Sequence, residues 1–440
     1  MSMEKKTDFD IVVVGAGVLG VTISYWLSSL YDCRIALVDT AQVAAAHTST
    51  RNTGVIHRPF YLDPVKKRIF AKTSFISHPM WESLAKREEL PWRPIGTFNV
   101  AAEETEVRTL EKYRRWGVEN GMEEKELDLL DGKEVRELEP EVNCRTALVS
   151  KTDVSVDFGV FTRYLWRRLG PQGVTFLGGR KVERIEERSG STTVAMRSRS
   201  GLLTLRSRFL INAAGGGSLD IAHYCGLAEQ YASLNFRGEY WVVDEPFASR
   251  VASNIYRPPR FPQYPFLDPH FVVRADGTRQ IGPNAVLVPG PYVYAGVGLS
   301  KLAAFLDRPA IPKVRLLMNG DFATLVAGEW RSSLSKSAMC DRVRKFVPGL
   351  DAGMLNRRAV FGVRSSVIDS SGFVPEAIQL RGEASAHIIN FNSPGATGAP
   401  AYSAMVVDQL REEGWFGWLS PRGGGPLIPG WDFEKVLAQF

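Results

Sequence analysis

A glycine-rich turn near the N-terminus constrains the fold of this chain more than any other feature. The apolar run 11–14 (IVVV) leads into the turn 15–20 (GAGVLG), a helical pattern follows, and a second apolar run, 34–39 (RIALVD), ends in an acidic residue. In such a unit the first glycine permits a tight turn, the second lets the backbone approach a pyrophosphate, and the third lets the helix pack closely on the strand. These glycines are Gly15, Gly17 and Gly20. Asp39 has about the spacing at which an acidic side chain binds an adenosine ribose, so the pattern predicts a dinucleotide-binding unit rather than a purely structural turn.

The composition excludes several classes of protein. At 440 residues the chain is too long for one ordinary core, which predicts two domains or one domain with a large insertion. Lys and Arg outnumber Asp and Glu by 54 to 48, and these charges are spread without a basic run, so nucleic acid is not an expected partner. The mild positive charge instead favours anionic substrates or anionic lipid surfaces.

The cysteines and the apolar runs indicate the compartment. Four widely separated cysteines form no CxxC or metal-ligand pattern, so we expect reduced thiols, a cytoplasmic protein and no bound metal. The first apolar run is short and is interrupted by the glycine turn, and no later run is long enough to cross a bilayer.

Separate parts of the chain repeat the arrangement of the glycine turn. Residues 212–218 (NAAGGGS) and 392–398 (NSPGATG) each follow an apolar strand pattern and precede a helical one. A flavin needs a second helix N-terminus near its pyrimidine end, so we favour FAD as the dinucleotide. Residues 235–360 instead show strand-like alternation with aromatic residues and a hairpin signal at Asp276-Gly277, which is typical of an antiparallel sheet.

The predicted fold class is therefore α/β, or α+β overall. We expect a Rossmann-like FAD-binding domain built from a discontinuous chain, together with an antiparallel-sheet substrate domain. Residues 1–90, 150–234 and 361–440 are assigned to the FAD-binding domain. Residues 91–149 and 235–360 are assigned to the substrate-binding domain.

Motifs along nearly the whole chain resemble those of one flavoenzyme family. They are 52–57 (NTGVIH), 236–240 (FRGEY), Tyr256 with 265–267 (PFL), 282–286 (GPNAV), 335–337 (SKS), 362–364 (GVR) and 392–397 (NSPGAT). With these motifs the chain resembles FAD-dependent oxidoreductases of the D-amino-acid-oxidase type, and within them L-2-hydroxyglutarate dehydrogenases and oxidases. The resemblance implies oxidation of a small anionic 2-hydroxy acid, L-2-hydroxyglutarate to 2-oxoglutarate, by hydride transfer to flavin N5. sn-Glycerol 3-phosphate and amino acids are the alternative substrates of this fold, and a flavin-binding subunit without a substrate site is the alternative outside it.

The chain departs from the family pattern at two places. Arg51 stands where relatives usually carry a histidine that in some of them is attached covalently to the flavin, so the resemblance implies non-covalent FAD. After His57 the family's Ala-Gly is replaced by Arg58-Pro59, which adds a guanidinium beside the expected active-site loop. This extra cation favours an anion-rich substrate such as glycerol 3-phosphate.

Several polar residues are candidates for catalysis and substrate binding. His57 is the candidate base, because a neutral imidazole accepts a proton near physiological pH; the alternative is that it orients the flavin or satisfies the core. Arg237 and Arg364 are the first candidates for holding a substrate carboxylate, since a guanidinium can donate two parallel hydrogen bonds to it. Further candidates for substrate contact are Arg58, Lys336, Tyr240 and Tyr256. For the cationic residues the alternative is a salt bridge, and for the tyrosines it is aromatic packing.

The expected cofactor contacts come from the glycine-rich segments and from the resemblance. They are Gly15, Gly17, Gly20, Asp39, Thr50, Arg51, Asn52, Gly54, Val182, Ala214, Gly215, Gly362, Pro394, Gly395, Ala396 and Thr397. The resemblance implies that Val182 presents its backbone to adenine. The loop at Gly395 is expected to give N–H groups to the flavin pyrimidine carbonyl, where the helix dipole favours negative charge.

The tryptophan-rich segment 415–433 admits two interpretations. One is a position at a membrane interface, which suits an enzyme that passes electrons to a quinone or another carrier. The other is packing across its own domain or a partner subunit. A peripheral position on the cytoplasmic membrane face and a homo-oligomer are therefore both carried as expectations.

Overall fold

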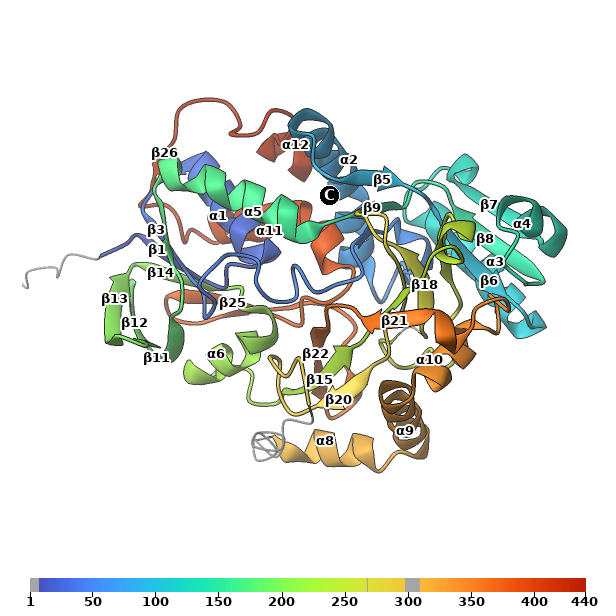
Figure 1. Ribbon diagram of the computed structural model, residues 1–440. Coiled ribbons are helices and arrows are strands. Elements are labelled where there is room, and N and C mark those ends of the chain that lie inside the picture. Colours follow the sequence, from blue (N-terminus) through green and yellow to red (C-terminus); the bar gives the residue numbers. More distant parts are fainter. Residues whose placement is uncertain (1–7, 267, 297–308) are drawn as a thin grey trace, which may run out of the picture.

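The computed structural model describes residues 8–266, 268–296 and 309–440. Residues 1–7 of the first predicted domain segment, Leu267 of the PFL motif and residues 297–308 of the predicted substrate domain lie outside the described residues. The described chain forms an α/β structure with several sheets, which confirms the predicted fold class (Figure 1).

A mostly parallel sheet contains the two strands that flank the glycine turn. Its six strands, in order, are β10 (Val174–Leu177), β3 (Ile35–Val38), β1 (Ile11–Val14), β14 (Phe209–Asn212), β25 (Ser385–Ile389) and β24 (Ile378–Arg381). Neighbouring strands run parallel, except that β24 runs antiparallel to β25 at one edge. Strands β1, β3 and β14 are buried along their whole length, so both of their faces carry apolar side chains, and their sequences are apolar except for Asn212 at the end of β14.

Helices cover one face of this sheet, and a small antiparallel sheet covers the other (Figure 1). The helical layer contains α1 (Val18–Leu30), α5 (Phe158–Leu169) and α11 (Gly395–Glu412), with α2 (Arg68–Glu88) and α12 (Phe433–Leu437) packed against α11. The other layer contains β11 (Lys181–Arg188), β12 (Ser191–Ser198), β13 (Gly201–Ser207) and α6 (Ser218–Tyr224). Ile11 and Val13 pack toward the helices, whereas Val12 and Val14 pack toward the small sheet. Alternate residues of β1 therefore hold both layers together.

Mainly antiparallel sheets form the rest of the molecule. The larger contains β21 (Leu355–Arg358), β16 (Trp241–Val243), β19 (Arg279–Gly282), β18 (His270–Val273), β17 (Asn254–Tyr256), β6 (Thr97–Ala101), β8 (Thr146–Ser150) and β7 (Leu127–Asp131). The smaller contains β20 (Val286–Val288), β15 (Ala232–Gly238), β22 (Gly362–Asp369) and β23 (Gly372–Phe373). The helices around them are α3 (Glu104–Glu119), α4 (Gly132–Leu138), α8 (Ala310–Leu317), α9 (Gly320–Leu334) and α10 (Lys336–Val343). Strands β18 and β19 form the hairpin predicted at Asp276-Gly277. Strand β22, from the segment 361–440 that was assigned to the FAD-binding domain, pairs with β15. The division of the chain into two domains stays a prediction.

A short sheet positions two polar residues. It consists of β4 (Val55–Ile56), β9 (Val154–Val156) and β5 (Trp92–Pro94), all antiparallel. Ile56 pairs with Val154 in this sheet. His57 follows β4 directly and Asp153 directly precedes β9, so strand pairing places the two side chains opposite each other.

The glycine turn has the close packing that its sequence predicts. Gly15 has a φ of +105°, a conformation that side chains rarely permit. A Cβ atom at Gly20 would lie 1.8 Å from the carbonyl oxygen of Gly15, which no real pair of atoms tolerates. The N-terminus of α1 can therefore approach β1 only because Gly20 has no side chain.

Substitution of Gly20 by Ala should destabilise the protein by more than about 2 kcal/mol, since the added methyl group meets fixed backbone. Gly328 is the matched control, because it lies inside α9 with nothing within 4 Å of an added Cβ. Gly328→Ala should stabilise the protein by about 0.5–1 kcal/mol through its better helix propensity. Urea unfolding measures both changes, and equal midpoints for the two variants would contradict the packing described for the turn.

The tryptophan-rich C-terminal segment packs onto its own chain. Trp431 is fully buried, with its ring centroid 6.1 Å from that of Trp26 and 5.5 Å from that of Trp81. The Arg208 guanidinium lies over the Trp418 ring, 4.1 Å from the centroid of that ring. These contacts agree with the second of the two interpretations of this segment, in which it packs across its own domain. Among the described residues no helix combines the length and the apolar character needed to cross a membrane.

Candidate active site

A cavity of about 350 Å³ reaches from the glycine turn to the loop at His57. The carboxyl ends of β1, β3 and β14 form one part of its wall, and residues of β15, β17 and β22 form another. Of the expected cofactor contacts, those that line it are Gly15, Gly17, Asp39, Arg51, Asn52, Gly54, Val182, Ala214, Gly215, Gly362, Pro394, Ala396 and Thr397. Of the expected catalytic and substrate contacts, those that line it are His57, Tyr240, Tyr256 and Arg364.

Three expected cofactor contacts lie outside the cavity wall. Gly20 packs against the backbone of Gly15 in the turn. The Thr50 hydroxyl donates to the carbonyl oxygen of His47 at 3.1 Å. Gly395 packs against the Phe391 ring, which would lie 3.0 Å from an added Cβ. These residues shape the loops around the cavity instead of facing it.

Three cationic side chains expected near the substrate are held elsewhere. Arg58 donates through Nη2 to both carboxylate oxygens of Glu126, at 3.0 and 3.1 Å. Arg237 forms a buried ion pair with Glu239 at 2.8 Å, and Lys336 donates to a backbone carbonyl at 3.3 Å. None of the three lines the cavity within the described part of the chain. In this structure the three side chains therefore have the salt bridge or hydrogen bond that was the alternative to substrate contact.

The end of the cavity near the glycine turn suits a dinucleotide with a pyrophosphate. The N-terminus of α1 borders this end, where the positive end of the helix dipole would attract a phosphate. The Asp39 carboxylate accepts hydrogen bonds from two backbone N–H groups at 2.7 and 2.8 Å, which fixes it at the cavity wall, where it would accept hydrogen bonds from a ribose. A side chain at Gly17 would narrow the cavity and would approach Ser49 Oγ to 3.1 Å. A second helix, α11, begins at the far end beside Thr397, so the residues present fit a flavin dinucleotide.

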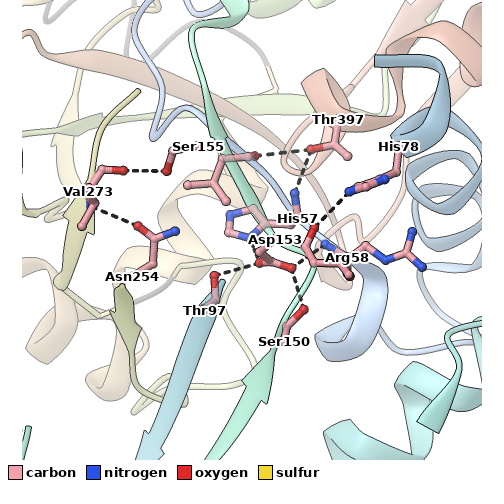
Figure 2. Close-up of polar contacts among 12 residues, drawn as sticks. His57, Arg58, His78, Thr97, Ser150, Asp153, Ser155, Asn254, Val273 and Thr397 are labelled. Carbon is pink, nitrogen blue, oxygen red and sulfur yellow. Dashed lines mark hydrogen bonds and ion pairs between the residues drawn. The ribbon is translucent and has the colours of Figure 1, made fainter. Parts of the chain in front are cut away.

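At the far end, His57 is held by a buried carboxylate (Figure 2). Nδ1 of His57 lies 3.1 Å from Oδ2 of Asp153, which has no exposed surface. Because a carboxylate can only accept hydrogen bonds, Nδ1 carries the proton of the neutral ring. Nε2 is therefore left as the acceptor, which is the state that a general base requires.

Asp153 receives donors on both of its oxygens. Besides His57, the Thr97 hydroxyl donates to Oδ2 at 2.9 Å. The backbone N–H of Arg58 donates to Oδ1 at 3.0 Å, and the Ser150 hydroxyl donates to the same atom at 2.7 Å (Figure 2). A buried carboxylate needs such compensation, and these donors also fix the direction in which it faces His57.

A stacked pair of side chains lines the cavity beside His57. The rings of Tyr256 and His270 lie 3.9 Å apart between centroids, and Nδ1 of His270 donates to the carbonyl oxygen of Asp268 at 3.2 Å. Burial lowers the pKa of His270 to about 3, so its ring is neutral. Tyr256 Oη and His270 Nε2 are buried and have no hydrogen-bond partner among the described residues. The pair therefore offers one hydroxyl and one acceptor nitrogen to a ligand.

The buried histidines predict a loss of stability in mild acid. Burial lowers the pKa of His270 to about 3 and that of His387 to about 4, whereas both titrate near 6.5 in the unfolded chain. Between these values the unfolded chain binds more protons than the folded protein. The folded state therefore has its full stability above pH 6.5 and loses stability as the pH falls toward 4. Urea unfolding should show that the free energy of unfolding falls by about 1.4 kcal/mol for each histidine per unit decrease in pH. His387→Gln should reduce the slope, and an unchanged slope would contradict the assignment.

Arg364 brings a positive charge to the same cavity. Its Nη1 donates to the carbonyl oxygen of Pro265 at 2.5 Å, and no carboxylate pairs with it among the described residues. Burial lowers the pKa of Arg364, but a guanidinium stays charged in proteins. A half-buried cation without a counter-ion is costly, and an anionic ligand offsets that cost.

Sequence reasoning missed Asp153 and His270. The signal for Asp153 is an acidic residue directly before the apolar strand 154–156, where a carboxylate needs partners. The signal for His270 is a histidine at the start of the apolar run 270–273. Neither signal identifies the partner, which in both cases lies on another strand.

The fold and the cavity together define a flavin-dependent oxidoreductase, because two helix N-termini border a dinucleotide cavity that ends at a histidine and an arginine. The family model described as FAD dependent oxidoreductase (DAO) matches residues 10–409. The chain therefore belongs to the DAO family of FAD-dependent oxidoreductases, and FAD is its cofactor.

Several known proteins are similar to this chain in sequence or in structure. The mitochondrial L-2-hydroxyglutarate dehydrogenase of Caenorhabditis briggsae is 27% identical over 415 residues, which cover 91% of this chain and 93% of the relative. L-2-hydroxyglutarate dehydrogenase of Escherichia coli K12 is 25% identical over 407 residues, with 92% and 93% covered. The structure of L-alpha-glycerophosphate oxidase from Mycoplasma pneumoniae has a TM-score of 0.71 at 22% identity and covers 97% of both chains. This last likeness supports the fold.

Proposed function

We propose that this protein is an FAD-dependent dehydrogenase of a small anionic 2-hydroxy acid, with L-2-hydroxyglutarate, oxidised to 2-oxoglutarate, as the first candidate. The observation that carries the proposal is that His57, held by Asp153, lines the same cavity as the half-buried Arg364. A base and a cation in one cavity suit a substrate that has both a hydroxyl group and a carboxylate. Relatives named L-2-hydroxyglutarate dehydrogenase, at 25% to 27% identity, support this choice of acid.

The side chains divide the work between binding and proton transfer. Arg364 binds a substrate carboxylate through the guanidinium N–H groups that Pro265 does not occupy. Nε2 of His57 accepts the proton of the substrate hydroxyl, and Asp153 stabilises the imidazolium that forms. When bound, FAD supplies the acceptor for the hydride that leaves the same carbon. Loss of that proton and that hydride converts the alcohol to a ketone.

Two other substrate classes are the alternatives. sn-Glycerol 3-phosphate offers an anion to Arg364 and a hydroxyl group to His57, and an amino acid offers a carboxylate and an amine. In the sequence, Arg58 was the residue that favoured the phosphate ester. Its ion pair with Glu126 removes that reason, so the 2-hydroxy acid is the better candidate.

Anaerobic mixing of the purified yellow protein with single compounds tests the proposal. L-2-Hydroxyglutarate should bleach the flavin absorbance, because only a true substrate reduces the flavin without oxygen present. The matched control is D-2-hydroxyglutarate, and glycerol 3-phosphate and a set of amino acids complete the panel. Bleaching by an amino acid or by glycerol 3-phosphate, with none by a 2-hydroxy acid, would replace the proposed substrate class. Bleaching by no compound would favour a flavoprotein without a substrate site.

A further inference from the structure

A segment that follows the antiparallel strand β20 borders the cofactor cavity. It comprises residues 289–296, which follow β20 directly. Pro291 and Tyr292 line the same cavity as Asp39 and the glycine turn, although β20 belongs to a different sheet. The cavity is therefore bounded on this side by a chain segment that the glycine-rich motifs do not contain.

Tyr292 lies at the end of the cavity where the adenosine of FAD is expected. Its ring centroid is 4.6 Å from that of His47, and a Cβ at Gly217 would lie 3.1 Å from its hydroxyl oxygen. Burial and, after it, the nearby Asp39 carboxylate raise the pKa of Tyr292. The side chain is nevertheless 37% exposed, so it forms part of the outer wall of the cavity.

Contacts of Tyr294 fasten the segment to the loop that follows β3. Its hydroxyl is 2.8 Å from Nδ1 of His47, and the Arg51 guanidinium lies over its ring, 4.3 Å from the centroid. Arg51 also donates to the carbonyl oxygens of Ala46 and Phe361, at 3.3 and 3.2 Å, which fixes the guanidinium in place. We call His47, Arg51 and Tyr294 the latch.

The residue between the two tyrosines anchors the segment from the other side. Val293 is 5% exposed and packs with Val286, Val288 and Val363 in an apolar cluster of β20 and β22. Tyr292 and Val293 thus contact opposite surroundings, the cavity and the protein interior. Because of this alternation, the contact of Tyr292 with the cavity and the anchoring of the segment by Val293 can be tested separately.

We propose that segment 289–296 closes over the adenosine half of FAD, with Tyr292 covering the adenosine and the latch holding the segment in place. An aromatic ring beside an adenine or ribose excludes water and adds stacking contacts. The glycine turn then binds the pyrophosphate, while a separate part of the chain limits its release. The proposal rests on FAD as the cofactor and not on the identity of the substrate.

Release of FAD from the holoprotein tests the proposal without any substrate. After dilution, the Tyr292→Ala holoprotein should release FAD at least about tenfold faster than the unchanged holoprotein. The fluorescence of free FAD measures the release rate. The matched control is Val293→Ala, which weakens the interior anchor of the segment but keeps the Tyr292 ring, so it should speed FAD release much less than Tyr292→Ala. Equal release from the two variants would assign the effect to folding of the segment and would overturn the proposal.

A comparison of flavins locates the contact on the cofactor. After removal of FAD, Tyr292→Ala should rebind FAD more weakly than the unchanged protein but should bind FMN equally well, because FMN has no adenosine. A similar loss of affinity for FMN would place Tyr292 at the flavin end and contradict the proposal. Tyr294→Phe, which removes only the hydroxyl of the latch, should also speed FAD release. Melting temperatures of the flavin-free variants verify that each one folds.

Discussion

Replacement of His57 by Gln is expected to slow reduction of the bound flavin by about 10²- to 10⁴-fold, the usual contribution of a positioned general base. Glutamine retains a polar side chain but cannot take up a proton. Anaerobic stopped-flow spectroscopy with L-2-hydroxyglutarate measures the rate directly. FAD content and melting temperature should stay close to those of the unchanged protein, which separates lost proton transfer from lost folding.

Asp153→Asn should cause a comparable loss through the tautomer of His57. The backbone N–H of Arg58 can only donate, so the amide oxygen of asparagine must face it and the NH₂ group must face His57. Nδ1 of His57 then has to accept that hydrogen bond, and the ring proton moves to Nε2. A histidine protonated at Nε2 cannot accept the substrate proton, so the reduction rate falls.

Ser150→Ala is the control for Asp153→Asn. It removes one donor to Oδ1 but keeps the carboxylate and therefore the tautomer of His57. We expect a small loss of stability, about 1 kcal/mol, and a reduction rate within a few-fold of the original. If Asp153→Asn reduced its flavin as fast as Ser150→Ala, Asp153 would not position the base.

Arg364→Ala is expected to weaken substrate binding by about 10²-fold or more. Hydrogen bonds to charged groups contribute about 1.5–3 kcal/mol each, and a guanidinium can form two with one carboxylate. Titration with 2-oxoglutarate under air, followed by changes in the flavin spectrum, measures affinity without turnover. Arg364→Lys should recover part of the affinity, because it restores the charge but not the paired geometry.

Arg237→Lys is the matched control for Arg364→Lys, because the Arg237 guanidinium is already bound to Glu239 and does not line the cavity. We expect it to lower stability and to leave the affinity for 2-oxoglutarate nearly unchanged. An equal loss of affinity at both positions would contradict the assignment of Arg364 as the carboxylate-binding residue.

The parts of the molecule that depend on neighbouring residues could be predicted from the sequence. The glycine turn is one example, because Gly15 and Gly20 meet each other across a single turn of chain. The hairpin at Asp276-Gly277 is another, since its two strands are separated only by that turn. His57 and Arg364 were also chosen as candidate site residues, on the chemistry of their side chains and on the family resemblance, and their roles stay predictions. Their presence in one cavity is what the structure adds.

The partners of buried charges could not be predicted, because they come from distant strands. Arg58 was expected near the substrate, yet Glu126, which is 68 residues away in the chain, binds its guanidinium. Asp153 lies 96 residues from His57 and reaches it only through the pairing of β4 with β9. Such a pairing depends on strand register, and a shift of β9 by one residue would turn Asp153 to the face opposite His57.

The order of strands in the central sheet limits when the protein can acquire its cofactor in the cell. β14 lies between β1 and β25, and α11 follows β25 with its N-terminus at the cavity. A growing chain emerges from the ribosome N-terminus first, so the glycine turn is available long before these C-terminal elements. Ribosome-bound chains that end before residue 385 should therefore hold no FAD, and cofactor loading becomes one of the last events in the maturation of this enzyme.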